Sequence, residues 1–291
     1  EWAWKGGRSP ALEQVLEEEA RADARKDPSA PAALLATSPL EVRALGRLEI
    51  LRAGQPLGAD AWRYPKPREL LLYLLSHPEG RTRDQIAVVF WPDASATQVK
   101  NNFHVMLHHV RKAIGRADLI VFDGDRYRIA WEAAVAFDAR VFEESARTGM
   151  RALKGARGGA DVQAALDTLR ATLIAYRGDF LAGEDAGDWH LEMRDRLRRL
   201  FGEAVMLLGN GHLERGENRE AADAFRRVVA VDELHEEAHR RLMLALTRAG
   251  DRSEAIKQYE RLSRVLQTDL EAEPERETKA LYERLRRAET V

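Results

Sequence analysis

The second half of the chain matches itself at an offset of 34 residues. A run of residues recurs in identity or type at that spacing, which is the signature of a stacked repeat protein. Each unit of such a protein is a small group of elements that buries its apolar face only against its neighbours. The matched pairs are Ala204/Ala238, Leu208/Leu242, Gly216/Gly250, Glu220/Glu254, Ala221/Ala255, Phe225/Tyr259, Arg227/Arg261 and Val231/Val265.

The residue types at the matched positions are those that a pair of packed helices needs. Alanine at 221 and 255 lets two helices approach closely, glycine at 216 and 250 supplies a helix C-terminal turn, and an aromatic ring at 225 and 259 fills the gap between helices. A period of 34 residues is that of the tetratricopeptide repeat. Residues 164–169 resemble a further repeat helix, and Pro274 opens a closing helix over 275–288. We therefore expect about eight helices over 138–290, stacked as a superhelix that binds partners on its concave face.

Bulk composition excludes several classes of protein. The chain has 291 residues, 46 basic and 48 acidic, and no cysteine. Without cysteine there is no disulfide framework, thiol nucleophile or thiolate-bound metal. The longest apolar run, residues 70–75, is far shorter than the ~20 residues of a membrane span. We expect a soluble, cytoplasmic protein with no membrane partner.

Charge is distributed unevenly along the chain. Residues 41–131 carry 14 basic and 10 acidic residues, a net charge of +4, whereas 132–291 carry a net charge of -4. The near-zero total thus hides a mildly basic middle segment, where a phosphate-binding surface would be expected.

Residues 1–39 form a leader with two interpretations. Residues 10–26 have a helical apolar pattern, and the breaker-rich stretch 27–31 follows them. The leader is either the last helix of an upstream helical domain or a disordered segment, and the first residues do not resemble a signal peptide.

The middle segment, 40–131, has the pattern of a winged helix. Short apolar stretches with Gly46 and Gly54 predict strands and a hairpin. A helix over 66–76 follows, and two capping boxes, Thr82 with Gln85 and Ser95 with Gln98, begin a short second and a longer third helix. Residues 119–129 then form a hairpin around an Asp-Gly turn. Two short helices, a tight break and a third helix make a helix-turn-helix, and the hairpin is its wing.

The third helix separates into two faces. An apolar stripe at spacings of three and four should be buried: Val99, Phe103, Met106, Leu107, Val110 and Ile114. An ordinary solvated face would usually include acidic residues, but the opposite face has none. Its side chains suit phosphates and base edges, so it is predicted to enter a major groove. The members of this face are Lys100, Asn101, His104, His108, Arg111 and Lys112.

Four further arginines lie where DNA phosphates are expected. Arg126 and Arg128 flank the wing turn and suit a minor groove or its phosphates, although they could equally be exposed strand residues. Arg81 and Arg83 lie at the start of the second helix, where backbone amides favour an anion.

The order of motifs resembles the SARP-type bacterial transcriptional activators, which join an OmpR-like winged helix to a tetratricopeptide-type bacterial transcriptional activator domain. The matching stretches are residues 66–75, 90–94, 109–115 and 176–181, followed by the repeats. The resemblance implies two domains, 40–131 and 132–291, and a fold that is mainly α with a small β part. Winged helices of this type also occur in longer regulators, so the chain could be the C-terminal part of one.

The resemblance also implies a function and partners. Such proteins bind promoter DNA, usually at direct repeats, and recruit RNA polymerase. Asn101 and Arg111 fall where the family has frequent polar and arginine contacts, and Trp91 and Asp93 lie in the turn that can face polymerase. A second copy or a regulatory protein would bind the repeats. The histidines at 104, 108 and 109 depart from the usual residues, so the target sequence cannot be transferred.

Other candidate sites are weaker. His104 and His108 have a spacing that can hold a metal, but no third ligand lies on their face, so no metal site is predicted. Arg177-Gly178-Asp179 is interpreted as a turn. Asp185, Asp188, His190 and Glu192 lack a nucleophile paired with a base. Without a glycine-rich phosphate loop, no cofactor is expected.

Two functions remain. The first is a sequence-specific activator. The second is a protein-interaction scaffold whose winged helix no longer binds DNA and whose acidic repeats hold a basic partner.

Overall fold

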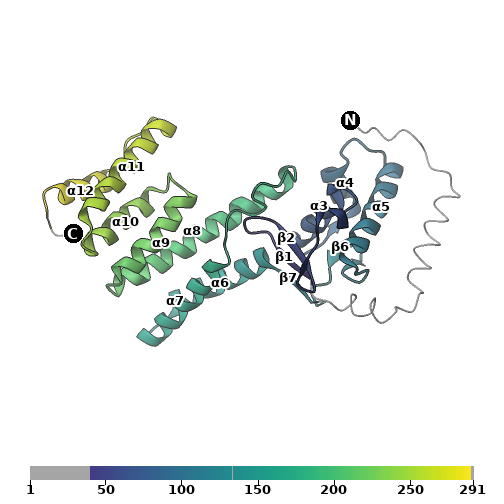
Figure 1. The fold of residues 1–291 in the computed structure, drawn as a ribbon, viewed down its shortest axis with the longest axis horizontal. Helices are drawn as coiled ribbons and strands as arrows, with labels where there is room; N and C mark the ends of the chain where they lie inside the picture. Colours follow the sequence, from purple (N-terminus) through teal and green to yellow (C-terminus); the bar gives the residue numbers. More distant parts are fainter. Residues whose placement is uncertain (1–39, 133, 290–291) are drawn as a thin grey trace.

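The computed structural model describes residues 40–132 and 134–289. The predicted leader helix over 10–26 lies outside these ranges. Within them, no helix is both long and apolar enough to cross a membrane. The molecule is elongated, with a winged helix at one end and stacked helices extending to the other (Figure 1).

The N-terminal sheet joins two segments that the sequence assigned to different domains. It contains β1 (Leu40–Arg43), β2 (Glu49–Arg52), β3 (Gln55–Pro56) and β7 (Val135–Phe137), in the order β3-β2-β1-β7. Strand β7 is parallel to β1, with Leu40 opposite Val135, whereas the other pairs are antiparallel. Strand β7 thus brings the chain back to the N-terminal sheet after residue 131, just before the helical half begins.

The winged helix has the expected elements. A short η1 (Ala59–Ala61) precedes α3 (Pro65–Leu75), β4 (Arg81–Thr82), α4 (Arg83–Phe90) and α5 (Ala96–Ile114). Both predicted capping boxes are formed, and Gly115 ends α5 with a φ of 68°. The wing strands β5 (Ile120–Asp123) and β6 (Arg126–Ile129) pair around the Asp-Gly turn, and β4 completes the sheet in the order β4-β6-β5.

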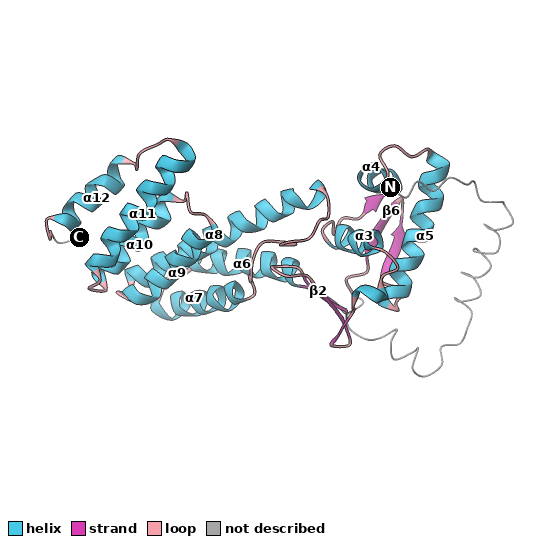
Figure 2. Ribbon diagram, turned by 45° about the horizontal axis from the view of Figure 1, so that its top comes forward, coloured by secondary structure: helices cyan, strands magenta, loops and turns pink. Residues whose placement is uncertain are grey.

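The C-terminal half contains seven α-helices in its described residues, where about eight were expected. They are α6 (Asp138–Gly155), α7 (Gly159–Ile174), α8 (Leu191–Glu214), α9 (Asn218–Val231), α10 (Glu236–Arg248), α11 (Arg252–Leu270) and α12 (Arg276–Arg286). The difference arises because residues 175–187 form a loop followed by a single short turn, η2 (Asp188–His190), and α8 continues unbroken for 24 residues. The fold class, a winged helix followed by a tetratricopeptide-like array, is confirmed (Figure 2).

The repeat residues have the predicted packing roles. Gly216 and Gly250 both have positive φ angles, 74° and 90°, at the ends of the first helices of the two repeats. Ala221 and Ala255 are fully buried. The ring of Phe225 packs so closely on α8 that a Cβ atom at Gly209 would lie 2.6 Å from it. Glycine at 209 is therefore a steric requirement of the helix pair.

The loop before η2 binds the winged-helix half to the helical half. Leu45 forms an antiparallel bridge with Phe180, and the amide of Leu181 donates to the carbonyl of Ala44 at 2.8 Å. Asp138, the first residue of α6, accepts hydrogen bonds from the amides of Ala44 and Leu45 at 2.8 and 3.0 Å. Backbone pairing and a buried carboxylate therefore connect the two halves.

Candidate nucleic-acid interface

The outward face of α5 is the centre of the candidate interface. The predicted apolar stripe is buried, and Lys100, His104, His108 and Lys112 are exposed opposite it, with Asn101 partly exposed. The helix contains no acidic residue along its 19 positions. It lies at the end of the molecule opposite α10–α12, so the stacked helices leave this side uncovered (Figure 1).

The side chain of Arg111 is bonded to the wing and is not exposed like the lysines and histidines of this face. Its Nη2 donates to the carbonyl of Ile120 in β5 at 2.9 Å, and its buried Nε has no partner in the described part of the chain. Burial lowers the pKa of its guanidinium. In this structure the Arg111 side chain is directed toward the wing, and its contact with DNA stays a prediction. The physical reason is that the wing folds over the last turns of α5 and takes its hydrogen bond.

His109, a sequence departure noted above, lies at the edge of the same helix and contacts Tyr64 edge-to-face, with 5.7 Å between ring centroids. Burial is the main cause that lowers its pKa, and the charges of His108, Arg63 and Lys112 add to the shift. Arg63 and Lys112 thus place two positive charges beside this edge of α5, which suits a surface that meets an anion.

The wing arginines already have partners within the hairpin. Arg128 Nε pairs with Asp123 at 3.2 Å, and Arg126 pairs with Asp125 at 3.7 Å while also donating to the Gly80 carbonyl at 3.3 Å. These pairs are partly exposed and therefore weak. A DNA phosphate could replace the carboxylate in each.

The two arginines at the start of α4 differ from one another. Arg81 lies in β4, is mostly covered, and pairs with Glu79 at 2.9 Å. Arg83 is the first residue of α4 and is exposed. Since the first amides of a helix favour an anion, Arg83 has the better position for a phosphate.

The turn after α4 is held in place by Lys66, for which the sequence pattern predicts no such role. Lys66 Nζ donates to the carbonyl of Phe90, the last residue of α4, at 3.1 Å. The ring of Trp91 packs on Phe90 at 5.9 Å, and Asp93 is exposed. The turn thus offers one half-buried ring and one exposed carboxylate to a partner.

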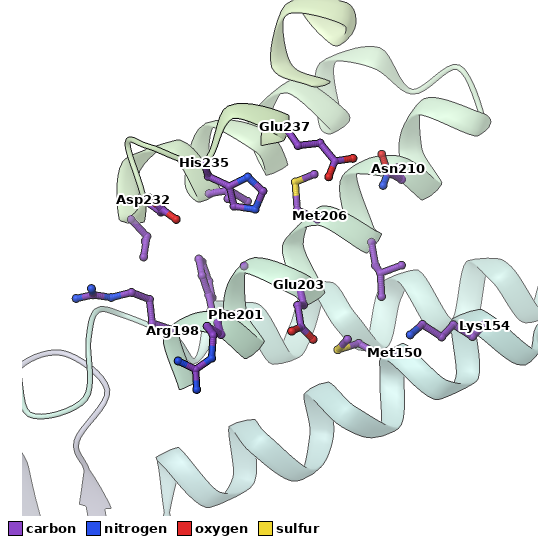
Figure 3. Close-up of a pocket in the computed structure, with 15 residues that line it drawn as sticks. Met150, Lys154, Arg198, Phe201, Glu203, Met206, Asn210, Asp232, His235 and Glu237 are labelled. Atoms are coloured by element: carbon purple, nitrogen blue, oxygen red, sulfur yellow. The ribbon is translucent and has the colours of Figure 1, made fainter. Parts of the chain in front are cut away.

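A groove of about 560 Å³ lies in the helical half, between α6, α8 and the segment that joins α9 to α10 (Figure 3). Phe201, Met150 and Met206 give it an apolar floor, and charged residues of both signs surround it. The side-chain oxygen of Asn210, on its wall, is buried without a partner among the described residues. The sequence predicted a concave binding face but did not identify these residues.

The other candidate clusters do not assemble as sites. His190 is buried, whereas Asp185, Asp188 and Glu192 are exposed. Asp179 of the Arg-Gly-Asp turn is bonded to Arg198 and to the Tyr176 hydroxyl. In the described ranges, no three His, Asp or Glu side chains gather as a metal-binding group.

A family model, the bacterial transcriptional activator domain, matches residues 137–286. The chain belongs to this family. The matched range begins at the last residue of β7 and ends with α12, so it covers the whole helical array.

Two curated regulatory proteins are similar to most of this chain. Regulatory protein AfsR of Streptomyces coelicolor and that of Streptomyces griseus are each 27% identical to this chain over 271 residues, which is 92% of the chain and 26% of each relative. The chain therefore spans about a quarter of the length of these relatives. The similarity confirms the resemblance to SARP-type transcriptional regulators.

A solved structure shares the overall fold of this chain. Mycobacterium tuberculosis EmbR, in complex with a low affinity phosphopeptide, superposes with a TM-score of 0.64 at 20% identity. The match covers 87% of this chain and 66% of EmbR. At this identity, it establishes the fold alone.

Proposed function

We propose that the chain is a sequence-specific DNA-binding activator that binds promoter repeats and recruits RNA polymerase. The observation that carries this proposal is the outward face of α5, which is free of acidic residues and rich in cations and imidazoles. A helix of this composition, at an uncovered end of a winged helix, is suited to a major groove. Membership of a transcriptional regulator family supports it.

The side chains divide by chemistry into base-reading and phosphate-binding groups. Asn101 suits adenine, and the imidazoles of His104 and His108 can each donate one hydrogen bond and accept another. The remaining basic groups would fix position and supply affinity without reading sequence. They are Lys100, Lys112, Arg81, Arg83, Arg126 and Arg128.

The turn after α4 is the proposed polymerase contact. The hydrogen bond from Lys66 to the Phe90 carbonyl supports this proposal, because it holds the start of the turn that contains Trp91 and Asp93. A turn that is already held by a hydrogen bond loses less conformational freedom when it contacts a second protein.

The helical half would supply contacts to a second copy of the chain or to a regulatory protein. The groove beside Phe201 gives this proposal a location. The same groove favours the second candidate, a protein-interaction scaffold, if the winged helix does not bind DNA. In either case we expect the protein to act in the cytoplasm and to lack enzymatic activity.

A selection of bound duplexes from random DNA, followed by competition at about 150 mM salt, tests the proposal. We expect the chain to enrich a motif and to prefer it over unrelated duplexes by about 10³-fold or more. A Lys100→Glu variant should lose binding, since it places a like charge against phosphates. Lys257→Glu, the same change at an exposed position on α11, is the matched control. Failure of any sequence to compete specifically would favour the scaffold.

A further inference from the structure

Phe122 is a large apolar side chain that the fold leaves in solvent. It lies in wing strand β5, and 61% of its surface is exposed. It shares a face of the strand with the buried Ile120, yet the wing does not cover its ring. Its exposure places an apolar surface at the side of the wing.

Three aromatic rings connect Phe122 to the recognition helix. Phe122 is directly opposite Tyr127 in the hairpin, and their ring centroids are 4.7 Å apart. Tyr127 in turn lies 4.5 Å from Phe103, which is fully buried in α5. The row of rings therefore begins in the core and ends at an exposed phenyl group.

The row also fixes the direction in which Phe122 faces. Residues opposite each other in an antiparallel pair lie on the same face of the sheet. Because Tyr127 contacts α5 through Phe103, Phe122 lies on the face of the wing that is turned toward α5. Figure 2 shows β6 beside α5. His104, a member of the outward face of α5, follows Phe103 directly, with 5.9 Å between the two rings.

The surroundings of this row are basic. The positive charges of Arg83 and Arg111 both act on the hydroxyl of Tyr127. The two carboxylates at the wing tip, Asp123 and Asp125, are each paired with an arginine. An apolar group bordered by cations matches the DNA backbone, in which the apolar edge of each deoxyribose alternates with a phosphate.

We infer that Phe122, supported from behind by Tyr127, packs on deoxyribose of the DNA strand that passes between the wing and α5. This inference rests on the proposed DNA-binding function. The contact adds affinity by removing apolar surface from water, and it neither reads a base nor neutralises a phosphate. Its contribution should therefore be independent of salt, unlike that of every basic residue at the interface.

The test uses the whole chain and the duplex obtained by selection, with the dissociation constant measured over a series of salt concentrations. Phe122→Ala should weaken binding about fivefold to tenfold at every salt concentration. The slope of log affinity against log salt should stay unchanged. Phe122→Leu should keep most of the affinity, because it preserves much of the apolar surface.

Two control variants separate the apolar contact from other effects. Arg83→Ala should reduce the magnitude of the salt slope by about 0.9, as expected for one lost phosphate contact. Val88→Ala, at a 72% exposed position on α4, should leave affinity unchanged.

Three outcomes would overturn the inference. If the wild-type chain binds DNA and Phe122→Ala binds equally well, the inference fails while the proposed function stands. If the wild-type chain binds no duplex, both fail. If Phe122→Ala converts a dimer to a monomer in sedimentation velocity and leaves the affinity per site unchanged, the ring belongs to an interface between copies.

Discussion

Arg111 in α5 and Ile120 in the wing are joined by a hydrogen bond from Nη2 to the backbone carbonyl, 2.9 Å long. The bond ties the last turns of α5 to the first residue of β5. This bond helps to set the angle between the two surfaces that DNA would contact. Arg111 is thus a positioning residue in this structure.

Replacing Arg111 tests that role. Arg111→Ala should lower the free energy of unfolding by about 1.5–3 kcal/mol, because the bond involves a charged donor and leaves the Ile120 carbonyl unpaired. Hydrogen exchange should show faster exchange in β5 and β6. DNA affinity should fall for all sequences alike. A loss confined to one base position, with unchanged wing protection, would instead identify Arg111 as a base reader.

Gly209 is predicted to be irreplaceable because of Phe225. An alanine Cβ would lie 2.6 Å from that ring, so Gly209→Ala should destabilise the chain by about 1–3 kcal/mol. Gly202→Ala in the same helix meets nothing within 4 Å and should be neutral or stabilising by up to about 1 kcal/mol. Adding Phe225→Leu should restore part of the lost stability. Equal urea midpoints for the two alanine variants would contradict this packing.

The carboxylate of Asp138 is predicted to hold the two halves of the molecule together. Asp138→Ala would leave the buried amides of Ala44 and Leu45 without acceptors, and we expect a loss of about 2–4 kcal/mol. Asp138→Asn keeps one acceptor and should lose less. Limited proteolysis of the 176–187 loop should be faster in both variants, and more so in the variant that loses more stability. Asp161→Ala, an exposed change in the first turn of α7, should shift stability by less than about 0.5 kcal/mol.

His239 should make stability depend on pH. It is fully buried, its Nδ1 lies 2.6 Å from the amide nitrogen of Gln258, and its Nε2 lies 3.1 Å from the Glu233 carbonyl. The neutral tautomer with its proton on Nε2 satisfies both contacts. Burial is the main cause that lowers its pKa from the usual 6.5.

The direction of the effect follows from proton uptake. Below pH 6.5 the unfolded chain binds a proton at His239 and the folded chain does not, so the free energy of unfolding falls as pH decreases toward the lower folded pKa. One proton contributes at most about 1.4 kcal/mol per pH unit. His239→Gln should flatten the pH dependence measured by urea unfolding, whereas His108→Gln on the exposed face of α5 should not. Identical curves for wild type and His239→Gln would contradict the prediction.

The local elements of the winged helix and the repeats were predictable because their signals are local. Capping boxes at Thr82 and Ser95, the Asp-Gly turn and the apolar stripe of α5 each depend on residues within one or two turns. The repeat was equally visible because its packing rules recur at a fixed spacing, with Gly216 and Gly250 supplying the same positive φ.

Tertiary structure decided which of those side chains face outward and where the halves join. Spacing alone placed Arg111 with the outward residues. A long side chain at the edge of a helix can turn to either side, and here it turns toward the wing because it donates a hydrogen bond to the Ile120 carbonyl. Similarly, the local sequence of β7 does not indicate that it pairs with β1. A three-residue strand is stable only beside a neighbouring strand, and that neighbour lies about 95 residues earlier in the chain. The sequence by itself therefore determined the elements, the repeat and the family, because these follow from short-range chemistry. Contacts between residues far apart in the chain, which only the folded structure brings together, determined the shape of the interface.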